Sequence, residues 1–425
     1  MSDDATLIRE SFERIRRRAR HVVTYFYADL FSRSPDIRAQ FPEDMSEQFD
    51  RLFAALGHIV AHLDDPSLPG YLARLGRDHR KFGVTDDQYE AVGHSLVAAV
   101  RFGSGSVWDA QTEAAWYSAY SAAASAMRQG ARDAAARAEP SWWDAKVISH
   151  RLHHSHTAVI TVMPDLHYPF RPGQYATLQS ASLPGVWRPY SLVRTDPDAP
   201  LEFHVARVRR GRLSAVLCDQ TAPGGRIRLG PASGTMTVED VPSAHGVTLI
   251  AAGSGWAQVK SMLGSLVTRW PQPSTRVHVI ARSQEHFYDF DAMTSLAEQH
   301  PWLNMSWWFP QPGETRQGLT RRLHSALAAE GNWDAQHVRL SGPAPFLRET
   351  CSALTELGAS PDQLKHDPIP PAFSSRGQLY GHAEHFLDPQ PVQWIDPAPR
   401  VSESEDLGAE NASATQNSKD LSHHR

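Results

Sequence analysis

Cysteine is scarce in this chain, in which Cys218 and Cys351 are the only two among 425 residues. Two thiols exclude a disulfide framework, and they exclude a zinc or iron–sulfur site built from cysteine ligands. Long apolar runs are lacking as well, since no stretch approaches the roughly 18 residues that a membrane-spanning helix needs. The first residues, Met1 to Asp4, are polar and acidic, unlike a secretory signal. These absences predict a cytoplasmic protein with no membrane span.

A strong excess of charge of one sign is also missing. The net charge is −5, which gives no reason to expect nucleic acid as a partner. Hydrophobic residues make up 41% of the chain, enough for sizeable cores, and the length allows about three domains. Changes of pattern along the chain divide it into residues 1–138, 144–242, 245–370 and 371–425.

Residues 1–138 carry helical periodicity and almost no strand signal, which predicts an all-α domain. In the clearest helix, residues 46–63, the apolar side chains form one stripe. His58 and His62 lie four residues apart, a spacing that suits metal chelation. Both fall outside the stripe, so we expect two solvated histidines. Further helices are expected over residues 69–82, from the capping box at Thr85, and over residues 108–138.

The next two regions change period. Residues 144–242 contain short strands punctuated by glycine and proline, which predicts a small antiparallel β-barrel. From residue 247 to 358 strands and helices alternate, which predicts a parallel-sheet α/β domain. Residues 371–425 are rich in proline and then in serine, asparagine and aspartate, and are expected to be a disordered tail.

Two short segments carry most of the chemistry. Arg188-Pro189-Tyr190-Ser191 places a guanidinium, an aromatic ring and a hydroxyl on one extended segment. Such a set suits a flavin: the arginine pairs with pyrophosphate, the ring stacks, and the hydroxyl bonds to the flavin edge. The run from Gly253 to Gln258 connects a predicted strand to a predicted helix, where a dinucleotide binds.

His79 is the decisive residue of the first domain, because it projects from the apolar face of its helix. Taken alone, it is most simply a buried histidine satisfied by a hydrogen bond. Three features favour a haem ligand instead: Tyr27 lies in an aromatic run, Phe41 stands directly before a proline, and Gln48 borders the apolar stripe of the next helix.

In this order the motifs resemble those of the flavohaemoglobins over about residues 5–370. The resemblance implies an all-α globin, then an antiparallel β-barrel that binds FAD as in ferredoxin reductases, then a parallel-sheet α/β domain that binds NAD(P). It implies an NAD(P)H-dependent nitric oxide dioxygenase, a monomer or dimer. This enzyme would pass electrons through FAD to haem b, bind O2 and oxidise nitric oxide to nitrate.

The resemblance assigns the haem pocket residue by residue. His79 would be the proximal ligand of the haem iron. Tyr27, supported by Gln48, would donate a hydrogen bond to bound oxygen, worth about 1.5–3 kcal/mol. Tyr89 would reach towards the proximal histidine, or is equally well a core tyrosine. The apolar walls would be Phe26, Phe41 and Leu52.

The resemblance also assigns the other two cofactor sites. FAD would be held by Tyr175, Arg188, Pro189, Tyr190, Ser191, Arg212, Leu213, Ser214, Asp367 and Ile369. NAD(P) would be held by Gly253, Ser254, Gly255, Trp256, Ala257, Gln258, Ser341, Gly342 and Pro343. Arg282 and Ser283 end the second strand, where a 2′-phosphate is read, and hint at NADPH. The choice between NADH and NADPH stays open.

Several positions depart from the family pattern. Gln258 replaces a proline and Trp256 is bulky, so the lobe binds NAD(P)H with altered affinity or has lost it. The last globin helix lacks the family's glutamate, for which Asp133 is the candidate substitute. Asp78 stands where relatives place a lysine that pairs with an acid. Its C-terminal match is Asp367, so the haem–flavin interface must be built differently.

Two other functions remain open on the sequence. The departures at Trp256 and Gln258 and the missing glutamate motivate an oxygen- or redox-binding sensor or carrier globin with a degenerate reductase lobe. A flavin reductase or oxidase that uses another electron donor, with haem as acceptor, is the third possibility.

Overall fold

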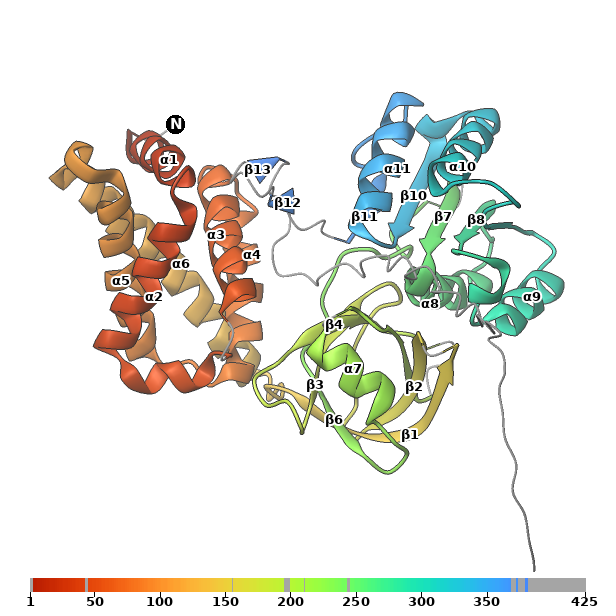
Figure 1. The fold of residues 1–425 in the computed structure, drawn as a ribbon, viewed down its shortest axis with the longest axis horizontal. Coiled ribbons are helices and arrows are strands. Elements are labelled where there is room, and N and C mark those ends of the chain that lie inside the picture. The colour runs from red at the N-terminus through yellow and green to blue at the C-terminus, as the bar shows by residue number, and fades with distance from the viewer. Residues whose placement is uncertain are drawn as a thin grey trace, which may run out of the picture. The chain divides into compact units, whose positions relative to one another are not determined.

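The computed structural model describes residues 3–42, 45–154, 156–194, 199–209, 211–242 and 245–367, with residues 46 and 47 described by their backbone alone (Figure 1). Beyond them it describes the backbone of two paired strands, β12 (Ala372–Phe373) and β13 (Leu379–Tyr380). The tail was expected to span residues 371–425. Apart from these two strands, it lies outside the described residues. No helix in the described part of the chain has both the length and the hydropathy to cross a bilayer.

The first part of the chain is all α, as predicted. Its elements are α1 (Asp3–Arg16), α2 (Ala19–Arg33), η1 (Pro35–Gln40), α3 (Ser46–Ala61), α4 (Leu68–His79), η2 (Arg80–Phe82), α5 (Asp86–Ser104), η3 (Gly105–Val107) and α6 (Ala110–Ala136). The capping box at Thr85 is present, with the Gln88 side chain accepting from the Thr85 backbone N–H at 3.2 Å. The helices pack around a core that includes Ile15, Leu30 and Val100.

Helices α4 and α6 cross with their backbones in contact. A Cβ atom at Gly76 would lie 1.9 Å from the carbonyl oxygen of Met127, and one at Gly130 would lie 2.1 Å from that of Ala73. Both distances are far below van der Waals contact, so only glycine fits at either position. The crossing therefore fixes α4, whose last residue is His79, against the longest helix of this lobe.

The expectation of two solvated histidines on α3 is wrong for His58. His58 is 7% exposed. The centroid of its ring lies 4.2 Å from that of His62 and 4.5 Å from that of Tyr71 on α4. The reason is that α4 covers this side of α3, so a second apolar face exists that the single stripe did not reveal. No group of three or more metal-ligating side chains occurs within the described residues.

The second part is a six-stranded antiparallel sheet in the order β4-β3-β6-β1-β2-β5. Its elements are β1 (Trp143–His153), β2 (Thr157–Pro164), β3 (Tyr175–Ser180), β4 (Arg188–Ser191), β5 (Leu201–Ala206), α7 (Arg212–Asp219) and β6 (Arg226–Leu229). A bridge between Val193 and Glu202 joins the two outer ends of the sheet and nearly closes the barrel. In β1, buried and exposed residues alternate only in the first half of the strand.

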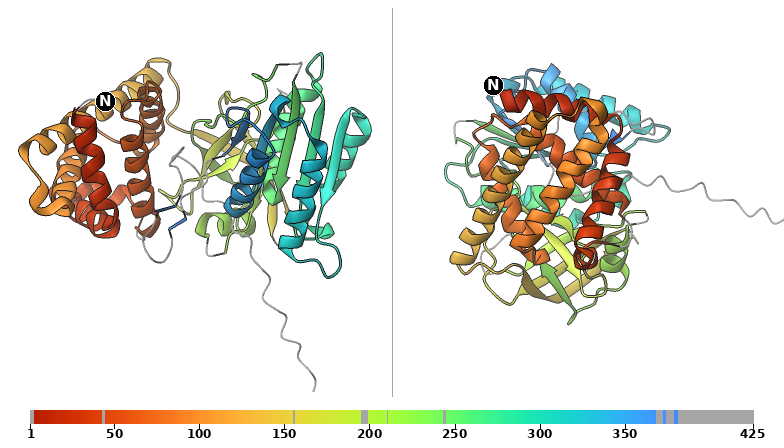
Figure 2. Two further views of the ribbon diagram at one scale, coloured as in Figure 1. Left: turned by 90° about the horizontal axis from the view of Figure 1, so that it is seen from above. Right: turned by 90° about the vertical axis from the view of Figure 1, so that its left-hand side faces the viewer.

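The third part is a parallel sheet in the order β11-β10-β7-β8-β9. Helices α8 and α9 cover one face and α10 and α11 the other, as right-handed crossovers require (Figures 1 and 2). The elements are β7 (Gly246–Ala252), η4 (Gly253–Gly255), α8 (Trp256–Val267), β8 (Thr275–Ile280), η5 (Gln284–His286), α9 (Phe290–Gln299), β9 (Leu303–Trp308), α10 (Arg316–Glu330), η6 (Trp333–Ala335), β10 (Gln336–Ser341), α11 (Ala344–Glu356) and β11 (Leu364–His366).

The strand order reverses between β7 and β10, where the chain returns past its first parallel strand. Ligands of open α/β sheets bind at such a switch point, beyond the carboxyl ends of the strands. The two sequence motifs assigned to NAD(P) lie at the carboxyl ends of these strands: residues 253–258 follow β7, and residues 341–343 begin with the last residue of β10.

Candidate functional site

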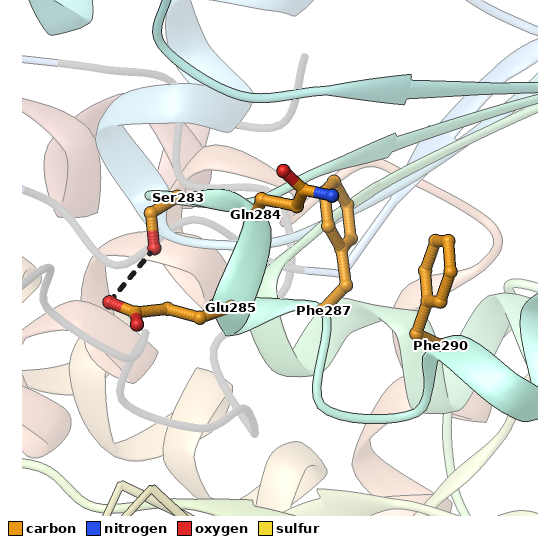
Figure 3. Close-up of a pocket in the computed structure, with 5 residues that line it drawn as sticks. All are labelled: Ser283, Gln284, Glu285, Phe287 and Phe290. Carbon is orange, nitrogen blue, oxygen red and sulfur yellow. Dashed lines mark hydrogen bonds between the residues drawn. The ribbon is translucent and has the colours of Figure 1, made fainter.

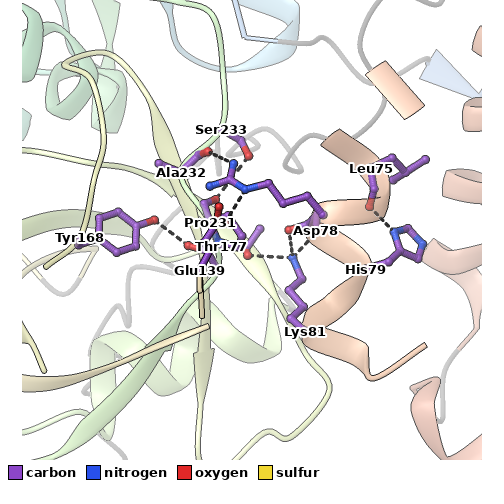
Figure 4. Close-up of polar contacts among 12 residues, drawn as sticks. Leu75, Asp78, His79, Lys81, Glu139, Tyr168, Thr177, Pro231, Ala232 and Ser233 are labelled. Carbon is purple, nitrogen blue, oxygen red and sulfur yellow. Dashed lines mark hydrogen bonds and ion pairs between the residues drawn. The ribbon is translucent and has the colours of Figure 1, made fainter. Parts of the chain in front are cut away.

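His79 ends α4 with a ring whose two nitrogens have different surroundings. Nδ1 lies 2.8 Å from the carbonyl oxygen of Leu75, one turn back (Figure 4). A carbonyl only accepts, so Nδ1 carries the proton and Nε2 keeps its lone pair. Nε2 has no hydrogen-bond partner among the residues that the structure describes, and burial lowers the pKa of the ring. A neutral imidazole oriented in this way fits a metal ligand.

The residues expected on the distal side come together around Tyr27. Its ring stacks on Phe49 with centroids 5.3 Å apart and meets Phe41 edge-on at 5.5 Å. Its hydroxyl donates to the backbone carbonyl of Gln48 at 3.4 Å. Phe26 and Leu52 belong to the same apolar cluster. Burial raises the pKa of the Tyr27 phenol, so it stays a hydrogen-bond donor at neutral pH.

Within the part of the chain that the structure describes, neither Tyr89 nor Asp133 makes a hydrogen bond with His79. The Tyr89 ring lies under the Arg128 guanidinium at 5.7 Å, and its carbonyl accepts from the Tyr120 hydroxyl. These contacts support the core interpretation of Tyr89. Asp133 is exposed and accepts from the Gln129 amide of its own helix at 2.6 Å, so the suggestion that it replaces the family's glutamate is wrong. The side of α6 that meets α4 carries Gly130 instead, which leaves no room for a carboxylate.

Strands β3 and β4 bring the expected flavin residues side by side. Tyr175 pairs with Ser191, and Leu178 pairs with Arg188. All four residues of β4 are half-buried, whereas β3 is mostly buried. Arg188, Pro189, Tyr190 and Ser191 therefore keep part of their surface open, as a flavin-binding strand must.

Helix α7 supplies a start that suits a pyrophosphate. No side chain caps its first turn, so the first amides have no intrahelical partner. Ser214 closes the turn by donating to the Gly211 carbonyl at 3.2 Å, and Arg212 is exposed. Leu213 packs into the barrel core, so only its backbone can meet a ligand. With β4, this arrangement fits a flavin dinucleotide.

The two glycine motifs of the parallel sheet touch each other. Gly253 adopts a positive φ of 58°, and a Cβ at Gly255 would lie 2.3 Å from the carbonyl oxygen of Ser341. Ser341 is the last residue of β10, Gly342 and Pro343 follow it, and residues 253–255 follow β7. The close approach leaves the backbone amides of both turns at the switch point, where a dinucleotide phosphate is bound.

The bulky departures at this turn point inward. Trp256 is fully buried, and its indole N–H donates to the Asp289 carboxylate at 2.7 Å. Ala257 is buried beside it. Gln258 is also fully buried, and its amide donates to the Gly173 carbonyl at 2.7 Å. These side chains therefore support the turn from within the fold.

The segment that follows β11 reaches the same place. Burial raises the pKa of Asp367 to about 7, against the lowering effect of a hydrogen bond with the Gln258 side chain. Gln258 thereby joins Asp367 to the flavin-side turn at Gly173. Ile369, expected to cover the flavin, lies outside the described residues.

Comparisons with known proteins agree with this order of parts. Residues 24–127 match the family model Globin. The chain is 25% identical over 391 residues to the flavohemoprotein of Rhodopirellula baltica, covering 85% of this chain and 95% of the relative. In its order of parts, the chain is similar to the flavohaemoglobins.

Two further likenesses concern the parts of the chain and its fold. Over 209 residues it is 29% identical to the ferredoxin–NAD(P)+ reductase component of the naphthalene 1,2-dioxygenase system of Pseudomonas putida, covering 48% of this chain and 62% of the relative. Its fold is similar to the crystal structure of flavohemoglobin from Malassezia yamatoensis, with a TM-score of 0.72 at 18% identity, covering 87% of this chain and 99% of the other.

A buried ionic network connects the barrel to the parallel sheet. The Glu202 carboxylate on β5 lies 2.8 Å from the Lys260 ammonium on α8 and 2.7 Å from Nε2 of His204. Lys260 also meets Asp289 at 2.9 Å, and Tyr288 meets His204 at 2.7 Å. Burial alone would raise the pKa of Glu202, but His204 and Lys260 lower it to about 2.

The low pKa of Glu202 predicts acid lability. A carboxyl whose pKa is depressed in the folded state stabilises the fold above its ordinary pKa, and this contribution is lost as pH falls towards the folded value. We expect Glu202→Gln to lower the melting temperature at pH 7 and to lose most of this difference from the wild type near pH 3. Thermal unfolding at both pH values measures it. Glu298→Gln, on the exposed side of α9, is the control.

A pocket of about 600 Å³ opens beyond the carboxyl end of β8 (Figure 3). The lining residues are Ser283, Gln284, Glu285, Phe287 and Phe290. Figure 3 shows the two phenylalanine rings on one side and the Ser283 hydroxyl directed at the Glu285 carboxylate, 3.4 Å away. β8 is the neighbour of β7, so the pocket lies at the same edge of the sheet as the glycine turn.

Proposed function

We propose that this chain is a flavohaemoglobin, an NAD(P)H-dependent oxidoreductase that holds haem b and FAD and converts nitric oxide and O2 to nitrate. One observation carries the proposal: the His79 ring commits Nδ1 to Leu75 and leaves the Nε2 lone pair to a metal. The same chain contains the half-buried strand β4, which suits a flavin, and a glycine turn at the switch point of the parallel sheet. The similar solved flavohemoglobin contains bound FAD and heme, which supports the same cofactors here.

In the globin lobe, the protein would hold the haem and shield its distal side from water. When bound, haem supplies redox-active iron, FAD relays electrons and NAD(P)H provides them. His79 would hold the iron, with Leu75 fixing the orientation of its ring. The Tyr27 hydroxyl would turn from the Gln48 carbonyl, 3.4 Å away, to donate into the distal side, and the apolar cluster around it would exclude water. Phe26, Phe41 and Leu52 would form the apolar walls of the haem pocket.

In the reductase lobe, the protein's part is to orient two dinucleotides. Arg188 and the start of α7 would bind the FAD pyrophosphate, and Tyr190 and Ser191 would contact the flavin. Residues 253–258 and 341–343 would bind NAD(P)H. The sensor alternative rested on Trp256 and Gln258 as signs of a degenerate reductase lobe, and on the glutamate that the last globin helix lacks. Because both side chains turn into the fold, they support an intact turn and favour the enzyme.

The activity is tested by nitric oxide consumption. Purified protein loaded with haem and FAD should consume nitric oxide under air when NADH or NADPH is added, with nitrate as the product. Consumption no faster than that of free haem at the same concentration would contradict the proposal.

The pocket beyond β8 favours NADH over NADPH. A carboxylate such as Glu285 suits the ribose hydroxyls of NADH, whereas a 2′-phosphate would meet like charge. Arg282, the residue that hinted at a 2′-phosphate, is not one of the described residues that line this pocket. We expect kcat/KM to be at least about tenfold higher for NADH, since facing like charges costs more than ~1.4 kcal/mol. Glu285→Gln should reduce the preference while Glu298→Gln keeps it, and an equal rate with NADPH in the wild type would refute this assignment.

A further inference from the structure

Lys81 is a buried cation at the place where the globin lobe meets the flavin barrel. Its side chain is 2% exposed. The ammonium lies 2.6 and 2.8 Å from the two carboxylate oxygens of Asp78 and 3.0 Å from the Thr177 hydroxyl on β3 (Figure 4). Its three N–H groups are thus all used, two within its own helix end and one across to the barrel.

A charge buried to this degree is costly unless it is fully paired. Asp78 supplies the opposite charge, and the rings of Phe82 and Trp187 each lie 5.2 Å from the ammonium, within cation–π range. Trp187 directly precedes the flavin strand β4. The site is therefore complete only when the α4 end and the barrel are in contact.

The two ends of this contact lie close to the two cofactor sites in the chain. Lys81 follows His79 by two residues. Thr177 pairs with Pro189 of the flavin strand and lies two residues after Tyr175, so it shares a face of β3 with Tyr175. Gly230 makes room for the contact, because a Cβ there would lie 2.2 Å from the Thr177 hydroxyl.

A second set of contacts holds the same helix end independently of Lys81. The Arg77 guanidinium pairs with the Glu139 carboxylate at 2.5 Å and donates to the Ala232 carbonyl at 3.4 Å. Arg80 donates to the Glu139 carbonyl at 2.7 Å. Figure 4 shows these partners on the barrel side of α4, with the His79 ring on the other side. Loss of Lys81 therefore removes the link to β3 and leaves the helix end attached.

We propose that Lys81 is a positioning residue that docks the His79 end of α4 on the flavin-binding strands and so sets the rate of electron transfer from flavin to haem. Asp78 holds the Lys81 ammonium at this interface. The inference rests on the proposed function. In the step concerned, one electron leaves the reduced flavin and converts ferric haem iron to ferrous.

The test separates the two halves of the electron path. Lys81→Met and Thr177→Val are compared with the wild type by anaerobic stopped-flow absorbance, after mixing with NADH. We expect flavin reduction and ferricyanide reduction to be unchanged, while haem reduction slows about tenfold in Lys81→Met as the charge-assisted contact is lost. Thr177→Val, which keeps the Lys81–Asp78 pair, should slow the same step to a smaller extent. Lys146→Met, an exposed lysine on β1, is the control.

A second measurement does not depend on the cofactors' activity. Hydrogen exchange of the full chain should become faster in the segments around residues 76–84 and 174–181 in both variants and stay unchanged in Lys146→Met. If haem reduction and hydrogen exchange both proceed at wild-type rates in both variants, the docking role is overturned. Absence of nitric oxide consumption in a wild type that still reduces its haem would count against the proposed function alone.

Discussion

Replacement of His79 by alanine is expected to reduce the haem content of the purified protein to background. The imidazole is oriented by the Leu75 carbonyl at 2.8 Å, and its Nε2 is the atom left for iron. Alanine offers no ligand in its place. FAD content should stay at the wild-type level, because the flavin strands belong to the separate barrel. The pyridine haemochrome assay and the flavin released on denaturation measure the two cofactors.

The matched control is His94→Ala, which removes an exposed imidazole from α5 and should keep its haem. A His79→Ala protein with normal circular dichroism and unchanged haem content would show that the proximal assignment is wrong. The same result would remove the basis for reading α4 as the haem helix.

Gly76→Val is expected to have the largest effect on stability. Its Cβ would lie 1.9 Å from the Met127 carbonyl, a backbone atom that cannot move without separating α4 from α6. Overpacking at such a contact costs about 3 kcal/mol. Because α4 ends in His79, haem binding should weaken together with the fold. Urea unfolding followed by circular dichroism gives the change in free energy of unfolding.

Gly70→Ala tests the same helix at a position with space. The nearest atom to its Cβ would be the end of the Arg74 side chain, 3.6 Å away. Alanine favours a helix by up to ~1 kcal/mol over glycine, so this variant should be neutral or more stable. Equal destabilisation by both substitutions would mean that the close crossing of α4 and α6 does not exist.

Much of the fold follows from periodicity in the sequence. Helical spacing identified the first lobe, and the alternation of strand and helix identified the parallel sheet. The order of motifs predicted which strand pair would bind the flavin and which turn would bind the nicotinamide dinucleotide. His79 stood out because it projects from an apolar face, a property that depends only on local spacing.

What the sequence could not predict depends on contacts between distant segments. The directions of Trp256 and Gln258 are set by Asp289 and Gly173, far along the chain. The role of Lys81 needs Thr177, 96 residues away. His58 is buried by α4, which its own helix pattern does not reveal. For Trp256, Gln258 and His58, tertiary packing decided between interpretations that the local pattern left open or ranked wrongly, whereas Lys81 carried no signal in its local pattern.

One anaerobic experiment tests the central claim most directly, that NADH, flavin and His79-bound haem form one electron path in a single chain. Wild-type protein with both prosthetic groups is mixed with NADH under carbon monoxide, and the flavin and haem bands are followed together. The account predicts that flavin absorbance falls first and that the haem band then shifts to its ferrous carbon monoxide position. A flavin that stays oxidised, or a reduced flavin beside haem that stays ferric, would contradict it.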